Sequence, residues 1–261
     1  MSREYAYVRP WLYPKQAEFL FHPARYVVVE ASTKTGKTVG CLVWLAEQAM
    51  LGGRPGRNYW WVAPVFSQSE IAFGRLQRFY PHGMCEPNNS KMTLTLPNGA
   101  MIWFKSGDKP DSLYGEDVYA AVIDEASRCK EDSWYAVRTT LTATGGPVRI
   151  IGNVKGRRNW AWHLARLAEQ GEEDMAYFKL TAHDAVEAGV LSEKEIEDAR
   201  RKLPDAIFRE LYLAEPGDDT GNPFGTQAIA SCLTPLSPAA PASWGIDLAK
   251  STDWTVCIAL D

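Results

Sequence analysis

The chain has 261 residues, of which 46% are hydrophobic and 23% charged, and its formal net charge is −4. These values are ordinary for a globular enzyme, and they argue against a protein that holds nucleic acid through one broad basic face. No apolar run approaches the roughly 20 residues that a membrane-spanning helix needs, so we expect no membrane contact. The five cysteines are scattered without a CxxC spacing, which predicts neither a zinc site nor a disulfide framework.

Predicted helices and strands alternate along most of the chain. We expect a short helix over 11–23 with Pro14 at its start, a buried strand over 26–30, a helix over 39–50, a strand over 58–63 and a helix over 69–80. Alternating residues around a Pro-Asn-Gly turn predict a β-hairpin within 92–105. Further strands are expected at 118–123, 148–152 and 177–181, and further helices at 131–141, at 159–169 and from the capping box that begins at Ser192. This alternation predicts an α/β fold with a mainly parallel central sheet flanked by helices.

The amino-acid composition changes after residue 214. Residues 215–243 contain five prolines and several small residues, which is typical of a linker. A new strand begins at 244, shortly before the end of the chain. We therefore expect a domain over 1–214, a linker over 215–243 and the start of a second domain over 244–261.

The strongest motif lies between the strand at 26–30 and the next helix. Residues 31–38, ASTKTGKT, match the phosphate-binding loop GxxxxGK[ST] except that Ala31 replaces the first glycine. Backbone N–H groups of such a loop surround phosphate oxygens at a helix N-terminus, where the helix dipole favours anions. Lys37 would reach the β and γ phosphates, and the Thr38 hydroxyl would bind Mg²⁺. The other predicted nucleotide-binding residues of the loop are Ser32, Thr33, Lys34, Thr35 and Gly36.

An acidic pair follows the buried strand at 118–123. Asp124 would hold Mg²⁺, and Glu125 would orient and polarise the attacking water. Two carboxylates at the end of an apolar strand are costly without a cation. A helix N-terminus that favours acidic residues is the alternative explanation, which the phosphate loop makes the weaker one.

Several further residues are candidates on weaker signals. The Gln16 amide can match the edge of adenine, and the plain alternative is a surface glutamine. Asn153, which follows the strand at 148–152, can sense the γ-phosphate, and the plain alternative is a turn residue. The basic segment 155–160 can contact a phosphate backbone or supply a charge to a neighbouring active site, or it is a solvated loop. Asp247, near the start of the last predicted strand, can be a metal ligand of a phosphodiesterase or a residue of a turn.

Taken together, these segments resemble the large terminase subunit of tailed bacteriophages, the motor that packages DNA into capsids. The resemblance rests on the Gln16 segment, the altered phosphate loop, the hairpin, and the segments SLYGEDVYAAVIDEAS at 112–127, PVRIIGNVKG at 147–156 and GIDLAKSTDWT at 245–255. It implies a RecA-like P-loop NTPase of the additional-strand class with a helical lid-like segment over 190–214. After the linker it implies an RNase H-like nuclease domain of which only the first strand is present, so this chain should not cut DNA.

The resemblance also implies roles and partners. Lys37 and Thr38 bind ATP and Mg²⁺, Asp124 and Glu125 form the Walker B pair, Asn153 couples hydrolysis to movement, and Asp247 is the first metal-binding aspartate of the nuclease. The family acts as a homo-oligomeric ring on the portal protein, with a small terminase subunit that selects the double-stranded DNA. We expect it in the host cytoplasm, at the portal vertex of the procapsid and not in the mature virion, with this chain a monomer in isolation.

Two departures from the family leave the arginine finger open. Many relatives carry an arginine where this chain has Thr33, and some carry one where it has Tyr114. The remaining candidates are Arg128, Arg138, Arg157 and Arg158. A helicase-type translocase, or an assembly module whose ATPase is silent in isolation, are the alternative functions.

Overall fold

The computed structural model describes residues 6–217, 228, 231–232, 240–248 and 255–260. The chain divides into two compact units, Met1–Thr220 and Gly221–Asp261. Among the described residues, no helix has both the length and the apolar character needed to cross a lipid bilayer.

The first unit is built on one eight-stranded sheet with the order β3-β4-β5-β2-β6-β7-β1-β8. Its parallel strands are β1 (Tyr26–Ala31), β2 (Asn58–Ala63), β5 (Met101–Ser106), β6 (Val118–Ile123), β7 (Val148–Gly152) and β8 (Met175–Leu180). Strands β3 (Glu86–Asn88) and β4 (Thr93–Thr95) extend the sheet in antiparallel pairing. The predicted α/β fold with a mainly parallel sheet is confirmed.

Helices cover both faces of this sheet. One apolar cluster joins one sheet face to α1 (Pro14–Leu20), α2 (Lys37–Gly52) and α3 (Phe66–Gln77). The other joins the opposite face to α4 (Glu131–Thr140) and α5 (Trp160–Glu169). The alternation along β1 explains the division, because Val27 and Val29 belong to the first cluster and Val28 to the second. A strand buried on both faces reads as the continuous apolar run seen in the sequence.

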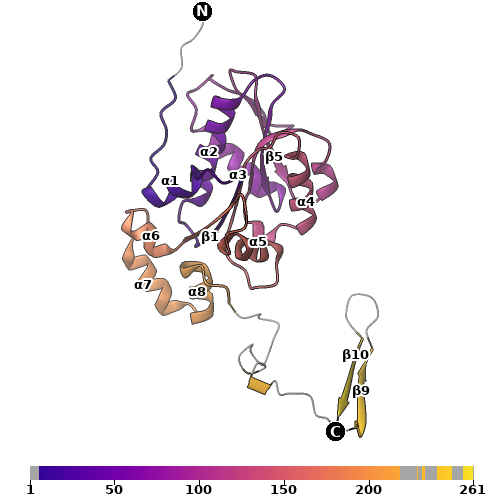
Figure 1. Cartoon of the computed structure of the whole chain (residues 1–261). Helices are drawn as coiled ribbons and strands as arrows, with labels where there is room; N and C mark the ends of the chain where they lie inside the picture. Colours follow the sequence, from indigo (N-terminus) through magenta and orange to yellow (C-terminus); the bar gives the residue numbers. More distant parts are fainter. Residues whose placement is uncertain (1–5, 218–227, 229–230, 233–239, 249–254, 261) are drawn as a thin grey trace, which may run out of the picture. The chain divides into compact units, whose positions relative to one another are not determined.

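Three short helices form a separate layer with its own small apolar cluster. They are α6 (Ala182–Glu187), α7 (Glu193–Lys202) and α8 (Asp205–Leu213), and the cluster is formed by Ala182, Ile196 and Phe208. Figure 1 shows this layer beside α1, and we call it the α6–α8 layer. The helix expected from Ser192 corresponds to α7, and the helical segment expected over 190–214 contains α7 and α8, whereas α6 was not predicted.

Several predicted boundaries were wrong for identifiable reasons. Helix α1 begins at Pro14, as predicted, after the extended Tyr13, but it ends at Leu20 and does not reach residue 23. Helix α3 begins three residues early, after the extended Val65. At α7 the predicted capping box does not form, since Ser192 precedes the helix without a side-chain cap. A capping box is instead present at α6, between Thr181 and Asp184.

The second unit contains two described strands where one was expected. Strands β9 (Ser243–Asp247) and β10 (Val256–Leu260) pair antiparallel, with Asp247 opposite Val256. Much of the predicted linker and residues 249–254 of the motif that follows Asp247 lie outside the described residues.

Candidate functional site

The loop between β1 and α2 has the backbone of a phosphate-binding loop. Lys34 and Gly36 adopt left-handed conformations, with φ of 59° and 78°, and Gly36 is the N-cap of α2. A Cβ at Gly36 would lie 2.5 Å from the Gln16 amide nitrogen, so only glycine fits this turn. Ala31 can replace the usual first glycine because it is still the last residue of the buried strand β1.

Lys37 is the centre of the site. Its ammonium lies 2.6 Å from Asn153 Oδ1, 3.4 Å from the Ser32 carbonyl and 3.6 Å from Glu125 Oε1. The side chain is buried, so its charge is held by these oxygens more than by water. The structure thus brings together three residues that are far apart in the sequence, Lys37, Glu125 and Asn153.

The acidic pair ends β6, the strand next to β7 in the sheet. Asp124 is buried, and its Oδ2 lies 3.5 Å from the Thr38 hydroxyl. Glu125 has a left-handed backbone, with φ of 48°, and its N–H donates to Asp124 Oδ1 at 3.0 Å. The two neighbouring carboxylates thus have different partners, the Thr38 hydroxyl for Asp124 and the Lys37 ammonium for Glu125.

Burial is the main reason why the pKa of Asp124 is raised, to about 7, and the charge of Glu125 adds to it. Lys37, the Glu125 N–H and the Thr38 hydroxyl act in the opposite direction. A carboxylate in this position is stabilised by a nearby cation, which would favour its charged form. No group of three or more His, Cys, Asp or Glu within the described part of the chain could hold a metal ion. A donor set of one hydroxyl and one carboxylate suits Mg²⁺, which keeps waters and phosphate oxygens as its other ligands.

Asn153 reaches Lys37 because β7 approaches the acidic turn closely. A Cβ at Gly152 would lie 2.9 Å from the Ala126 nitrogen, and Ser127 donates from its hydroxyl to the Asn153 carbonyl at 2.8 Å. The dipeptide Gly152-Asn153 therefore combines a close approach of two loops with an amide that contacts the Lys37 ammonium.

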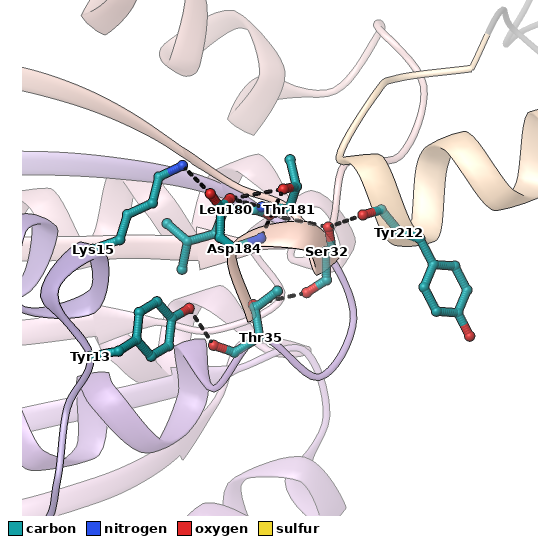
Figure 2. Close-up of polar contacts among 8 residues, drawn as sticks. All are labelled: Tyr13, Lys15, Ser32, Thr35, Leu180, Thr181, Asp184 and Tyr212. Atoms are coloured by element: carbon teal, nitrogen blue, oxygen red, sulfur yellow. Dashed lines mark hydrogen bonds and ion pairs between the residues drawn. The ribbon is translucent and has the colours of Figure 1, made fainter. Parts of the chain in front are cut away.

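Gln16 lies against the phosphate loop, with both ends of its amide bonded inside the protein. Its Oε1 accepts from the Tyr13 N–H at 3.2 Å, and its Nε2 donates to the Gly36 carbonyl at 2.9 Å. Tyr13 adds a bond from its hydroxyl to the Thr35 carbonyl at 2.8 Å (Figure 2). Helix α1 therefore braces the loop, a role that the sequence did not reveal for either residue.

The candidate arginines lie on different elements. Arg128 ends the short turn of 3₁₀ helix Ala126–Arg128, close to Glu125 in the chain. Arg157 and Arg158 lie in the loop that follows Asn153, and Arg138 is in the last turn of α4. Lys34 is exposed, and Asp247 lies in the second unit on the exposed strand β9.

Comparisons with known proteins agree with this geometry. No protein-family model matches the chain. Large terminase subunits of Thermus phage G20c and Thermus virus P23-45 are each 26% identical over 198 residues, which covers 63% of this chain and 41% of the relative. The chain thus spans less than half the length of these relatives.

Solved structures share the fold. The ATPase domain of the large terminase of Thermus phage P74-26 matches with a TM-score of 0.66 and 23% identity, over 78% of this chain and 94% of that domain. The large terminase of bacteriophage HK97 matches with a TM-score of 0.67 and 17% identity, over 95% of this chain and 60% of that one. The large terminase of a thermophilic bacteriophage, solved in complex with ADP, matches with a TM-score of 0.65 and 16% identity, over 78% of this chain and 53% of that one. In sequence the chain is a distant relative of phage large terminases, and in fold it matches their ATPase domain.

Proposed function

We propose that this chain is the ATP-hydrolysing module of a viral DNA-packaging motor. The observation that carries the proposal is the meeting of Lys37, Asp124, Glu125 and Asn153 at the carboxyl ends of adjacent parallel strands, next to a glycine-containing loop at a helix N-terminus. In open α/β sheets, ligands bind at this edge. The relatives solved in complex with ADP and with ATP-gamma-S support a nucleotide as the ligand.

Each residue of the site would have a distinct task. Lys37 and the N–H groups of the phosphate loop would bind and orient the phosphates. Thr38 and Asp124 would hold Mg²⁺, which would supply positive charge that stabilises the phosphates. Glu125 would hold the attacking water and accept its proton, and the Asn153 amide would contact the γ-phosphate. A trans arginine from a neighbouring copy would complete the site and raise the rate by about 10³–10⁵.

The wider assembly belongs to the same proposal. Residues 1–214 form the motor domain with its lid over 190–214, 215–243 the linker, and 244–261 the start of a nuclease domain that carries Asp247. The partners are double-stranded DNA, the portal protein and the small terminase subunit, and the working form is a ring at the procapsid vertex in the host cytoplasm. The relation to large terminases supports this assignment over a helicase-type translocase.

The test is phosphate release from Mg·ATP by the purified chain and its Glu125→Gln variant. We expect the variant to lose about 10²–10⁴ in kcat while it still binds ATP, because the change removes the base and leaves the loop intact. Glu70→Gln, an exposed glutamate on α3, is the matched control and should keep the wild-type rate. Chelation of the metal should abolish turnover in all three proteins.

Two results would count against the proposal. Unchanged turnover in Glu125→Gln would show that this residue is not the base. A wild-type chain that neither binds nor hydrolyses ATP, even at concentrations that drive oligomerisation, would favour a pure assembly module.

A further inference from the structure

Ser32 connects the phosphate loop to the α6–α8 layer through its polar groups (Figure 2). Its side chain is fully buried. Its N–H donates to the Leu180 carbonyl at 2.8 Å, and its hydroxyl lies 2.7 Å from the Tyr212 carbonyl and 3.1 Å from that of Leu180. In the next residue, the Thr33 N–H donates to the Leu211 carbonyl at 2.8 Å.

The carbonyl of Ser32 faces the other side, toward the site. It accepts from the Thr35 hydroxyl at 3.1 Å and from the Lys37 ammonium at 3.4 Å. Ser32 therefore contacts both the Lys37 ammonium and the end of α8. If the Lys37 ammonium or the backbone at Thr35 moves, the Ser32 carbonyl moves with it, and this shift changes the hydrogen bonds between Ser32 and the α6–α8 layer.

The acceptors on α8 are backbone carbonyls at the end of a helix. Leu211 and Tyr212 lie in the last turn of α8, where helix carbonyls have no partner within the helix and carry partial negative charge. The phosphate loop thus caps the C-terminus of α8 with the same stretch of chain that would accept an anion. A bound phosphate draws the N–H groups and Lys37 toward itself, and the negative end of α8 disfavours a second negative charge close by.

The three helices of the α6–α8 layer pack on one another, so they can move together. It has its own apolar cluster, distinct from the two that hold the sheet and its helices. A second polar tie joins it to α1, where Lys15 and Asp184 form an ion pair at 2.7 Å. Asp184 also accepts hydrogen bonds from Thr181 at the start of α6. The Lys15–Asp184 ion pair therefore anchors α6, the first helix of the layer, and Ser32 anchors α8, the last.

We infer that Ser32 is a positioning residue, which sets the phosphate loop and Lys37 relative to α8 and transmits phosphate binding to the α6–α8 layer. The inference rests on the proposed function, since it needs a nucleotide in the loop. It assigns a role to a loop position whose residue type the phosphate-loop pattern leaves free.

The experiment compares the wild type, Ser32→Ala and Ser133→Ala by steady-state ATP turnover and by amide hydrogen exchange. Ser133 is a matched control, because it is equally buried and donates from its hydroxyl to a backbone carbonyl, that of Gly107 at 2.7 Å. We expect Ser32→Ala to lower kcat about 2- to 10-fold with KM little changed, the scale of one lost hydrogen bond. In the wild type and in Ser133→Ala, ATP-gamma-S should alter exchange over 205–214; in Ser32→Ala this response should be lost.

Wild-type kcat together with a wild-type exchange response in Ser32→Ala would overturn the inference and leave the proposed function standing. If Ser32→Ala does not fold, the wild type decides alone, since an exchange pattern over 205–214 that ATP-gamma-S leaves unchanged would also overturn it. A wild-type chain that binds no ATP would overturn both proposals.

Discussion

Replacing Arg149 with methionine should destabilise the first unit by about 3–5 kcal/mol. Arg149 lies on β7 and is 2% exposed, and within the described part of the chain its guanidinium forms no ion pair with an acidic side chain. Its guanidinium donates to the carbonyls of Leu20 at 3.0 and 2.9 Å and of His22 at 2.8 Å, with a longer bond to Ala24 at 3.4 Å. It also lies 4.5 Å from the ring centre of Trp44.

The magnitude follows from what methionine cannot replace. The Leu20 and His22 carbonyls lie at the end of α1, and a buried acceptor that loses its donor costs about 1–3 kcal/mol. Burial of the charge offsets part of this, since it lowers the pKa of Arg149 to about 10. For a domain of this size, each kcal/mol corresponds to about 2–4 °C in Tm. We therefore expect a fall of about 6–20 °C.

Thermal unfolding followed by circular dichroism measures this fall directly. Arg25→Met is the control, because Arg25 also donates to two backbone carbonyls, of Leu141 and Gly146, but is only partly buried. We expect a loss there of about 1 kcal/mol. A Tm for Arg149→Met within about 2 °C of the wild type, or equal to that of Arg25→Met, would refute the reasoning. Since α1 carries Tyr13 and Gln16, a folded Arg149→Met protein should also bind ATP more weakly.

Two further predictions concern the site and its surroundings. Asn153→Ala should reduce the preference for ATP-gamma-S over ADP about tenfold in binding titrations, because the lost amide lies beside the Lys37 ammonium and is proposed to contact the γ-phosphate. Equal losses for both nucleotides would argue against a γ-phosphate sensor. For Asp184, partial burial raises the pKa, but bonds from Lys15 and Thr181 outweigh it and leave the pKa below its usual value. Its contribution to stability is present above the unfolded pKa of about 3.9 and is lost as the pH falls through the lower folded value. In urea unfolding, the free energy of unfolding should therefore fall less steeply with decreasing pH in Asp184→Asn than in the wild type. Identical slopes of this free energy against pH below pH 5 would contradict this.

The sequence predicted the parts of the fold that local patterns determine. Mostly apolar runs marked β1, β2, β6 and β7 because a strand buried on both faces favours apolar side chains, although Glu30, Asn58 and Arg149 are also buried there. Since the carboxyl ends of parallel strands share one edge, the motifs after β1, β6 and β7 could be expected to lie together, and the distances around Lys37 agree with that expectation.

The contacts that shape the phosphate loop could not be predicted in this way. Ser32 meets Tyr212 across 180 positions of sequence, and its partner is a backbone carbonyl that carries no sequence signal. Tyr13 likewise bonds the Thr35 carbonyl, and Arg149 bonds the carbonyls that end α1. One signal was present and unused: Thr181 and Asp184 have the spacing of a capping box and mark the start of α6.

The most direct test of the central claim is a crystal structure of the chain with Mn²⁺ and ATP-gamma-S, in which the anomalous signal locates the metal. The account predicts one Mn²⁺ bonded to the Thr38 hydroxyl and facing Asp124, directly or through a water, with the phosphates inside the loop 31–38 and next to Lys37. A nucleotide bound elsewhere, or a metal remote from both Thr38 and Asp124, would contradict it.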